Sequence, residues 1–192
     1  MTLTRGLAIA GLVVTAAVLG WIVRVGLLRW HGAASPDIVI ASPSAPPSQG
    51  RKIKAQLFYV SDDGAQLMNV ERDVPYSEST AEQAKAIINV QIAASGDDTV
   101  SAVPAGTKLR ALFVTPQGEA YVDFSPEIST GHPGGSRAEL LTVYTIVDAL
   151  TVNLPAIKAV HLLVDGKDVE TLAGHVDLRG PLAKNTSWMA EQ

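Results

Sequence analysis

The stretch "TGHPGGSRAELLTVYTIVDALTVNLPAIKAVHLLVDG", residues 130–166, decides the fold of this chain. After its double glycine, apolar residues recur at a spacing of three and four, which predicts a helix that ends before Pro155. Residues 159–164 are typical of an apolar strand, and Asp165-Gly166 is a strong signal for a two-residue hairpin turn. The stretch therefore predicts a glycine loop, a helix, a strand and a tight turn in succession.

Two further hairpins and one helix are predicted upstream of this stretch. The first hairpin pairs residues 52–60 with residues near 66–74 across the turn Ser61-Asp62-Asp63-Gly64. The second pairs residues 109–115 with 120–124 across Pro116-Gln117-Gly118, where proline and glycine suit a tight turn.

The upstream helix is predicted to run from Ser79 to about Ala94. Ser79 and Glu82 have the S-x-x-E spacing of a capping box, in which each side chain bonds a free N–H group of the first turn. The resulting order is β-β-α-β-β-α-β-β. It predicts an α+β fold, in which a mostly antiparallel sheet carries two helices packed on one face.

The N-terminus predicts a membrane anchor. Residues 7–23 carry no charge, the apolar character continues past Arg24, and Trp21 and Trp30 lie near the outgoing end. After a short tail, residues 1–6, we expect a transmembrane helix over 7–28 with the rest of the chain exported. The alternative is a cleaved signal peptide, for which Gly32-Ala33-Ala34 offers small residues of the right kind.

The remaining boundaries follow from composition. Residues 29–50 are rich in Pro, Ser and Ala, which is typical of a semi-extended linker. The folded domain is predicted over 51–183, and a flexible tail over 184–192.

Composition also limits the function classes. The chain has no cysteine, so it has no disulfide, thiolate metal site, thiol nucleophile or lipid-anchor cysteine. Residues 51–192 contain 12 Lys and Arg against 18 Asp and Glu, a net charge of −6. Nucleic-acid binding relies on a cationic surface, so we expect no nucleic-acid partner.

The double glycine raises the question of a ligand. A phosphate-binding P-loop needs a lysine followed by Ser or Thr after its glycines, a dinucleotide fingerprint needs G-x-G-x-x-G, and neither pattern is present. Instead Ser136 and Glu139 form a second S-x-x-E pattern, which favours a purely structural helix start. The alternative is a binding loop made by four residues: His132, Gly134, Gly135 and Arg137.

No catalytic or metal motif stands out elsewhere. The four histidines include no pair spaced four apart, although a metal site assembled from distant residues stays open, and no G-x-S-x-G elbow occurs. His161 is interpreted as a sheet residue with a local partner, and Asp123 as a solvated strand residue or a cap on a turn. We therefore predict no catalytic residue, no metal and no cofactor.

Several short motifs, taken in order, resemble the GerMN domain of sporulation and spore germination proteins. They are the P-x-G-T of residues 104–107, the VDFS of 122–125, the glycine pair 134–135, and the VDG of 164–166. The chain departs from the family's pattern in three ways. It has Asp148-Ala149-Leu150 where the family commonly shows Asn-Thr-Leu, it has one domain where the germination protein has two, and it lacks a lipid-anchor cysteine.

The resemblance implies an extracytoplasmic, usually membrane-tethered α+β domain that acts in assembly or scaffolding at the cell envelope, without established catalytic residues. We therefore expect a non-enzymatic envelope protein in the cytoplasmic membrane, whose partners are envelope proteins or peptidoglycan. One alternative is a domain that binds or senses a small molecule or wall fragment through the Gly134-Gly135 loop. A third is an enzyme, such as a wall hydrolase, whose acid and base lie on separate strands.

Overall fold

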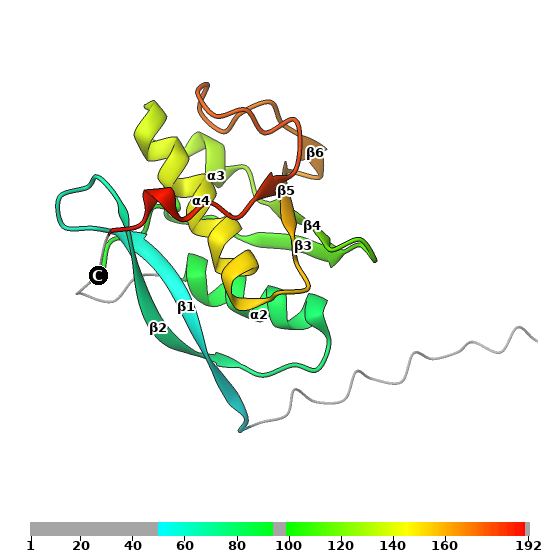
Figure 1. Cartoon of the computed structure of the whole chain (residues 1–192). Coiled ribbons are helices and arrows are strands. Elements are labelled where there is room, and N and C mark those ends of the chain that lie inside the picture. The colour runs from blue at the N-terminus through cyan, green and yellow to red at the C-terminus, as the bar shows by residue number, and fades with distance from the viewer. Residues whose placement is uncertain (1–49, 94–98, 191–192) are drawn as a thin grey trace, which may run out of the picture. The chain divides into compact units, whose positions relative to one another are not determined.

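The computed structural model describes residues 50–93 and 99–190, all of which belong to one compact unit spanning Pro46–Gln192 (Figure 1). The elements follow one another as β1 (Lys52–Val60), β2 (Leu67–Pro75), α2 (Thr80–Ile92), β3 (Leu109–Val114), β4 (Glu119–Phe124), α3 (Glu127–Thr130), α4 (Ser136–Asn153), β5 (Ala159–Val164), β6 (Lys167–Asp168), β7 (Leu182–Ala183) and the 3-10 helix η1 (Thr186–Trp188). The α+β class is confirmed, as are the three hairpins and the two long helices.

The first hairpin forms a sheet of its own. β1 and β2 pair antiparallel from Lys52 opposite Pro75 to Val60 opposite Leu67. Ser61 Oγ and Asp63 bond each other in the turn, and Gly64 takes a φ of 70°, which glycine adopts without steric cost.

The second sheet has five strands in the order β3-β4-β5-β6, and β7 also pairs with β5. β3 and β4 are antiparallel, whereas β4 and β5 run parallel from Glu119 opposite Ala159 to Phe124 opposite Val164. The parallel pair arises because α4 carries the chain back to the starting end of the sheet between the two strands. The mostly antiparallel pairing predicted from the sequence is confirmed, since four of the five strand pairs of the described residues are antiparallel, but the strands form two sheets instead of the single predicted one.

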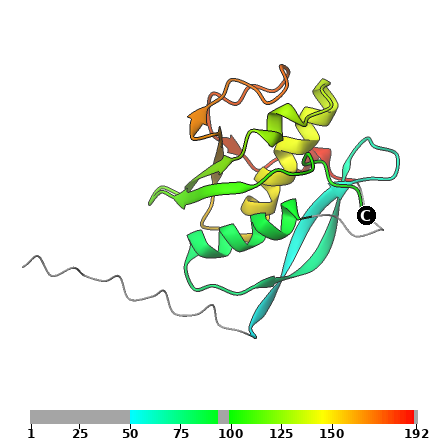
Figure 2. The same cartoon turned by 180° about the vertical axis from the view of Figure 1, so that it is seen from behind.

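Both long helices contact both sheets, so the prediction of two helices on one face of a single sheet leaves out their contacts with the hairpin. α4 packs against β1 on one side and β5 on the other, while α2 packs against β3 and the hairpin strands. Figures 1 and 2 show α4 between the β1–β2 hairpin and the strands of the larger sheet. α4 is consequently buried almost all round, including polar residues such as Thr142, Thr145 and Asp148.

Side-chain amides, rather than a third strand, bond the open edge of β1. Gln91 of α2 is fully buried; its Nε2 donates to Phe58 O at 2.7 Å, and its Oε1 accepts from Phe58 N–H at 2.9 Å. Asn153 of α4 makes the same paired contact with Gln56, at 2.8 and 2.7 Å. These amides satisfy backbone groups that a strand would otherwise pair, which explains why the hairpin stays separate from the larger sheet.

Neither predicted capping box forms. Ser79 is the N-cap of α2 but its side chain makes no cap bond, and Glu82 instead pairs with Lys85 at 2.7 Å. The N-cap of α4 is Gly135, one residue before Ser136. Both helices begin at the predicted place, but the predicted capping hydrogen bonds do not form.

The C-terminal segment contacts the rest of the domain up to residue 190, so these contacts extend into the described part of the predicted flexible tail over 184–192. β7 pairs with β5, Asn185 N–H donates to Asp148 Oδ1 at 3.0 Å, and Ala190 N–H donates to Leu67 O at 2.8 Å. The segment thus lies against β5, α4 and β2.

The predicted tail (1–6), anchor helix (7–28) and linker (29–50) lie outside the described residues, apart from Gly50. Within the described part of the chain, no helix has the length and apolar character needed to cross a membrane.

Candidate functional site

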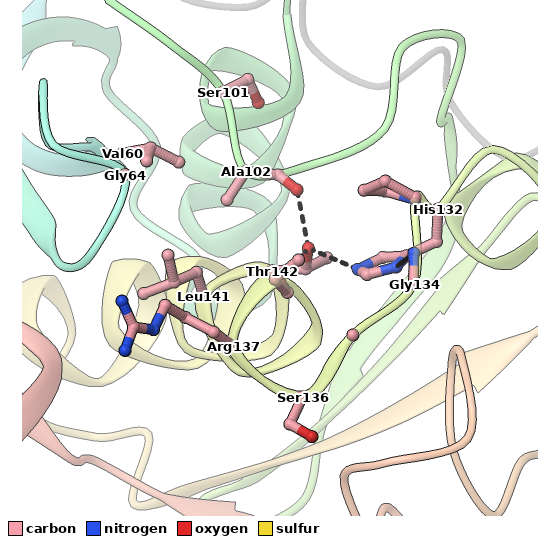
Figure 3. A pocket seen from close by; sticks show the side chains of 13 residues that line it. Val60, Gly64, Ser101, Ala102, His132, Gly134, Ser136, Arg137, Leu141 and Thr142 are labelled. Atoms are coloured by element: carbon pink, nitrogen blue, oxygen red, sulfur yellow. Dashed lines mark hydrogen bonds between the residues drawn. The ribbon is translucent and has the colours of Figure 1, made fainter.

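The four residues predicted to form a binding loop line one pocket. It has a volume of about 520 Å³ and is bounded by the loop 132–135, the first turns of α4, the end of β1 and the segment 101–102. Figure 3 shows Val60, Ala102 and Leu141 around it, which gives the pocket an apolar side. The structure thus brings His132, Gly134, Gly135 and Arg137 to a single hollow at the start of α4.

His132 uses both ring nitrogens within the protein. Its Nδ1 accepts from Gly134 N–H at 2.9 Å, which requires the lone pair there and places the proton on Nε2. Nε2 lies 3.1 Å from Thr142 Oγ1, and the Thr142 hydroxyl lies 2.6 Å from Ala102 O and donates to it. His132 therefore fastens the glycine loop to α4 and to the segment 101–102, as the dashed lines in Figure 3 show.

The two glycines are required by backbone conformation rather than by space. Gly134 and Gly135 have φ values of 84° and 91°, and a Cβ at either position would meet nothing within 4 Å. Gly135 leads directly into α4, whose first backbone bond runs from Glu139 N–H to Gly135 O at 3.0 Å. In the described residues no hydrogen bond joins the N–H groups of residues 136–138, so three donors at the positive end of the helix are available.

Arg137 is the exposed cation of the pocket. Figure 3 shows its side chain directed away from His132, on the other side of the start of α4. The pKa of Asp63 is held below its usual value by hydrogen bonds from Ser61 and the N–H of Ala65, and Arg137 adds a smaller electrostatic contribution. Arg137 thus faces the turn between β1 and β2.

Glu139 has a role that the sequence did not predict. Its side chain is fully buried; Oε1 accepts from the N–H groups of Leu172 and Ala173 at 2.8 and 2.9 Å, and Oε2 from that of His175 at 2.8 Å. Burial alone would raise the pKa of Glu139, but these hydrogen bonds together outweigh it and hold the pKa below its usual value. Glu139 anchors the segment after β6 to α4, so its carboxylate does not occupy the helix start.

The other residues considered from the sequence have structural partners. His161 Nε2 donates to Asp168 Oδ1 at 2.9 Å, which confirms its interpretation as a sheet residue with a local partner. Asp123 caps a turn, since it accepts from Gly166 N–H at 2.8 Å, but it is buried beside Arg110 and is not the solvated alternative. No group of three or more metal-ligating side chains occurs among the described residues.

The hairpin, the five-stranded sheet and the two helices between them define an α+β domain of the GerMN type. The sequence matches the family described as "Germane: Sporulation and spore germination" over residues 56–170, and the chain belongs to this family. No curated protein compared with the chain matches it.

Two solved structures share this fold. One is a protein from Clostridium perfringens, described provisionally as a lipoprotein; it has 20% sequence identity and a TM-score of 0.50, with 69% of this chain and 88% of that one covered. The other is the tandem GerMN domains of the sporulation protein GerM from Bacillus subtilis, with 18% identity and a TM-score of 0.50. That match covers 71% of this chain and 45% of the tandem structure.

Proposed function

We propose that this chain is a non-enzymatic cell-envelope protein whose GerMN domain is tethered to the cytoplasmic membrane and acts outside it. The observation that carries the proposal is the family match over residues 56–170, downstream of an uncharged apolar stretch over residues 7–23. The lipoprotein description of the similar Clostridium perfringens structure agrees with a membrane-associated domain on the outer side. In this role the domain binds another envelope protein or peptidoglycan, and it serves assembly rather than chemistry.

The test is co-purification from crosslinked membranes combined with sedimentation of the full chain with isolated peptidoglycan. We expect either a recurrent envelope protein in the crosslinked fraction or pelleting with the wall material. A chain that neither acquires an envelope partner nor sediments with peptidoglycan would count against the proposal.

A second function, binding of a small molecule or wall fragment, is favoured by the pocket of about 520 Å³ at the glycine loop. Its apolar side and the donors of the loop suit a ligand with both apolar and polar groups. Titration with a disaccharide-peptide wall fragment, followed by NMR, tests it. The expected shifts map to residues 132–142 and decrease in Arg137→Gln; shifts confined to other regions would reject this second function.

A further inference from the structure

Three aromatic rings stand in one row across the larger sheet. The ring of Phe113 in β3 stacks on Tyr121 in β4 with centroids 4.8 Å apart and an interplanar angle of 3°. Tyr121 in turn stacks on His161 in β5 at 5.0 Å and 17°. The strand register sets this spacing, because Phe113 is paired with Tyr121, and Tyr121 with His161.

This row lies on the sheet face that the helices do not cover. In β4, Ala120, Val122 and Phe124 are fully buried in the core, so Glu119 and Tyr121 point to the opposite face. Phe113 is 54% exposed, and apart from Val100 no other large apolar side chain of the described residues is classed as exposed. β3 is the last strand of the sheet among the described residues, so within this part of the chain one face of the Phe113 ring has no neighbouring strand.

Two carboxylates border the row at the end away from Phe113. Asp168 accepts from His161 Nε2 at 2.9 Å with its side chain 80% exposed, and Glu119 lies 3.8 Å from His161 Nδ1. Glu119 and Tyr121 alternate onto the same face of β4, which places that carboxylate beside the row, and its interaction with the Tyr121 hydroxyl raises the pKa of that hydroxyl. In the described part of the chain neither carboxylate has a Lys or Arg within ion-pair distance, whereas Arg110 pairs with the nearby Asp165 at 2.7 Å.

We propose that these five residues, Phe113, Tyr121, His161, Glu119 and Asp168, form an acidic aromatic patch that docks a basic, aromatic segment of a partner protein. The open face of Phe113 takes an aromatic or guanidinium group, and Glu119 and Asp168 pair with Lys or Arg of the same segment. The rings are already ordered by their stacking and by the His161–Asp168 bond, so little freedom is lost when a partner binds.

Charge and geometry favour a basic protein segment over a glycan. The stacked rings cover one another's faces, so only Phe113 presents a free face, and successive sugars would have no second ring to stack on. The two carboxylates without a Lys or Arg partner complement cations. The inference deepens the proposed role in protein assembly and rests on it.

The test measures binding of a fluorescein-labelled peptide with alternating Arg and Phe to the full chain in neutral detergent, by fluorescence anisotropy. We expect Glu119→Gln/Asp168→Asn to weaken binding about tenfold, because two exposed charge pairs are lost. Phe113→Ser should weaken it to a similar degree, and a peptide with Glu in place of Arg should not bind. Glu78→Gln removes an exposed carboxylate outside the patch and is the matched control, with unchanged affinity expected.

The proposal is overturned if the peptide does not bind, or if the patch variants, with unchanged circular dichroism and melting temperature, bind it as the wild type does. It is equally overturned if these variants no longer sediment with peptidoglycan but still bind the peptide with the affinity of the wild type. The two proposals can fail separately. If the patch variants capture an envelope partner as the wild type does, the envelope role stands and the patch proposal fails. If peptide binding depends on the patch but no envelope partner is found, only the envelope role is contradicted.

Discussion

Asp148→Asn should make the folded domain more stable at neutral pH. Asp148 lies in the middle of α4 with a fully buried side chain. Its Oδ1 accepts from Asn185 N–H at 3.0 Å, while its Oδ2 has no partner in the described residues. Burial raises the pKa of Asp148 from 3.8 to about 6, against the smaller opposing effects of the Asn185 N–H bond and the charge of Lys184.

The size of the effect follows from linkage between ionisation and folding. A carboxyl whose pKa is higher in the folded state favours folding while it is protonated, and it loses that contribution as pH rises from about 3.8 through about 6. At about 1.36 kcal/mol for each pH unit, the loss is about 3 kcal/mol at neutral pH. Asparagine keeps an oxygen that accepts from Asn185 N–H, and it cannot ionise. Its amide NH2 group, however, replaces Oδ2 at a buried position without a hydrogen-bond partner, which costs about 1–2 kcal/mol.

We therefore expect Asp148→Asn to be more stable than the wild type by about 1–2 kcal/mol at pH 7.5, with a melting temperature a few degrees higher. The assay is urea unfolding of both proteins at intervals from pH 4 to pH 7.5. The gain in the free energy of unfolding should shrink as the pH falls towards 4. A constant difference across this range, or a less stable variant at pH 7.5, would refute the reasoning. Asparagine is also the residue that the resemblance to the GerMN family implies at this position.

Four further substitutions and one control test other parts of the fold by the same urea measurement. Glu139→Gln should cost about 2–4 kcal/mol near neutral pH, because an amide cannot accept all three N–H groups. The wild type should also lose its advantage over this variant as pH falls below 4.5, the unfolded value, towards the lower pKa of the folded state. Gln91→Met should cost about 2–4 kcal/mol by leaving the buried N–H and C=O of Phe58 unpaired, and the more exposed Asn153→Ala should cost less. Gly135→Ala should cost about 1–3 kcal/mol, because alanine is strained at a φ of 91°. Gly180→Ala is the control, since its φ is not positive; an equal loss of stability there would show that backbone strain is not the cause.

Local signals were sufficient to predict most elements. The Asp165-Gly166 pair takes φ values of 54° and 73°, as a two-residue hairpin turn requires, and Gly118 has the positive φ expected at the end of the second turn. The start of α4 after the glycine pair could be predicted, because glycine itself permits the backbone conformation needed there.

The arrangement of the sheets depends on contacts that no local pattern contains. Gln91 and Asn153 bond backbone groups of β1 that are 33 and 97 residues away in sequence, and both read as ordinary helix residues. Glu139 shows the same limit, because the S-x-x-E pattern predicts a local bond while three N–H groups of the segment 172–175 bind the carboxylate instead.

The candidate site could be predicted only in part. The glycine loop was identified from its sequence, but much of the apolar side of the pocket comes from β1 and from the segment 101–102, far away in the chain. The acidic aromatic patch was not predicted, because it depends on the mutual register of four strands, β3 to β6, and two of these, β4 and β5, run parallel across a helical connection.

The location of the domain outside the cytoplasmic membrane is the central claim, and the absence of cysteine from the chain allows a direct measurement. Single cysteines are introduced by Gln117→Cys, in the exposed turn between β3 and β4, and by Thr2→Cys at the N-terminus. In spheroplasts a membrane-impermeant maleimide should label the cysteine at position 117 before lysis and the one at position 2 only afterwards. Labelling at position 117 only after lysis would contradict the account.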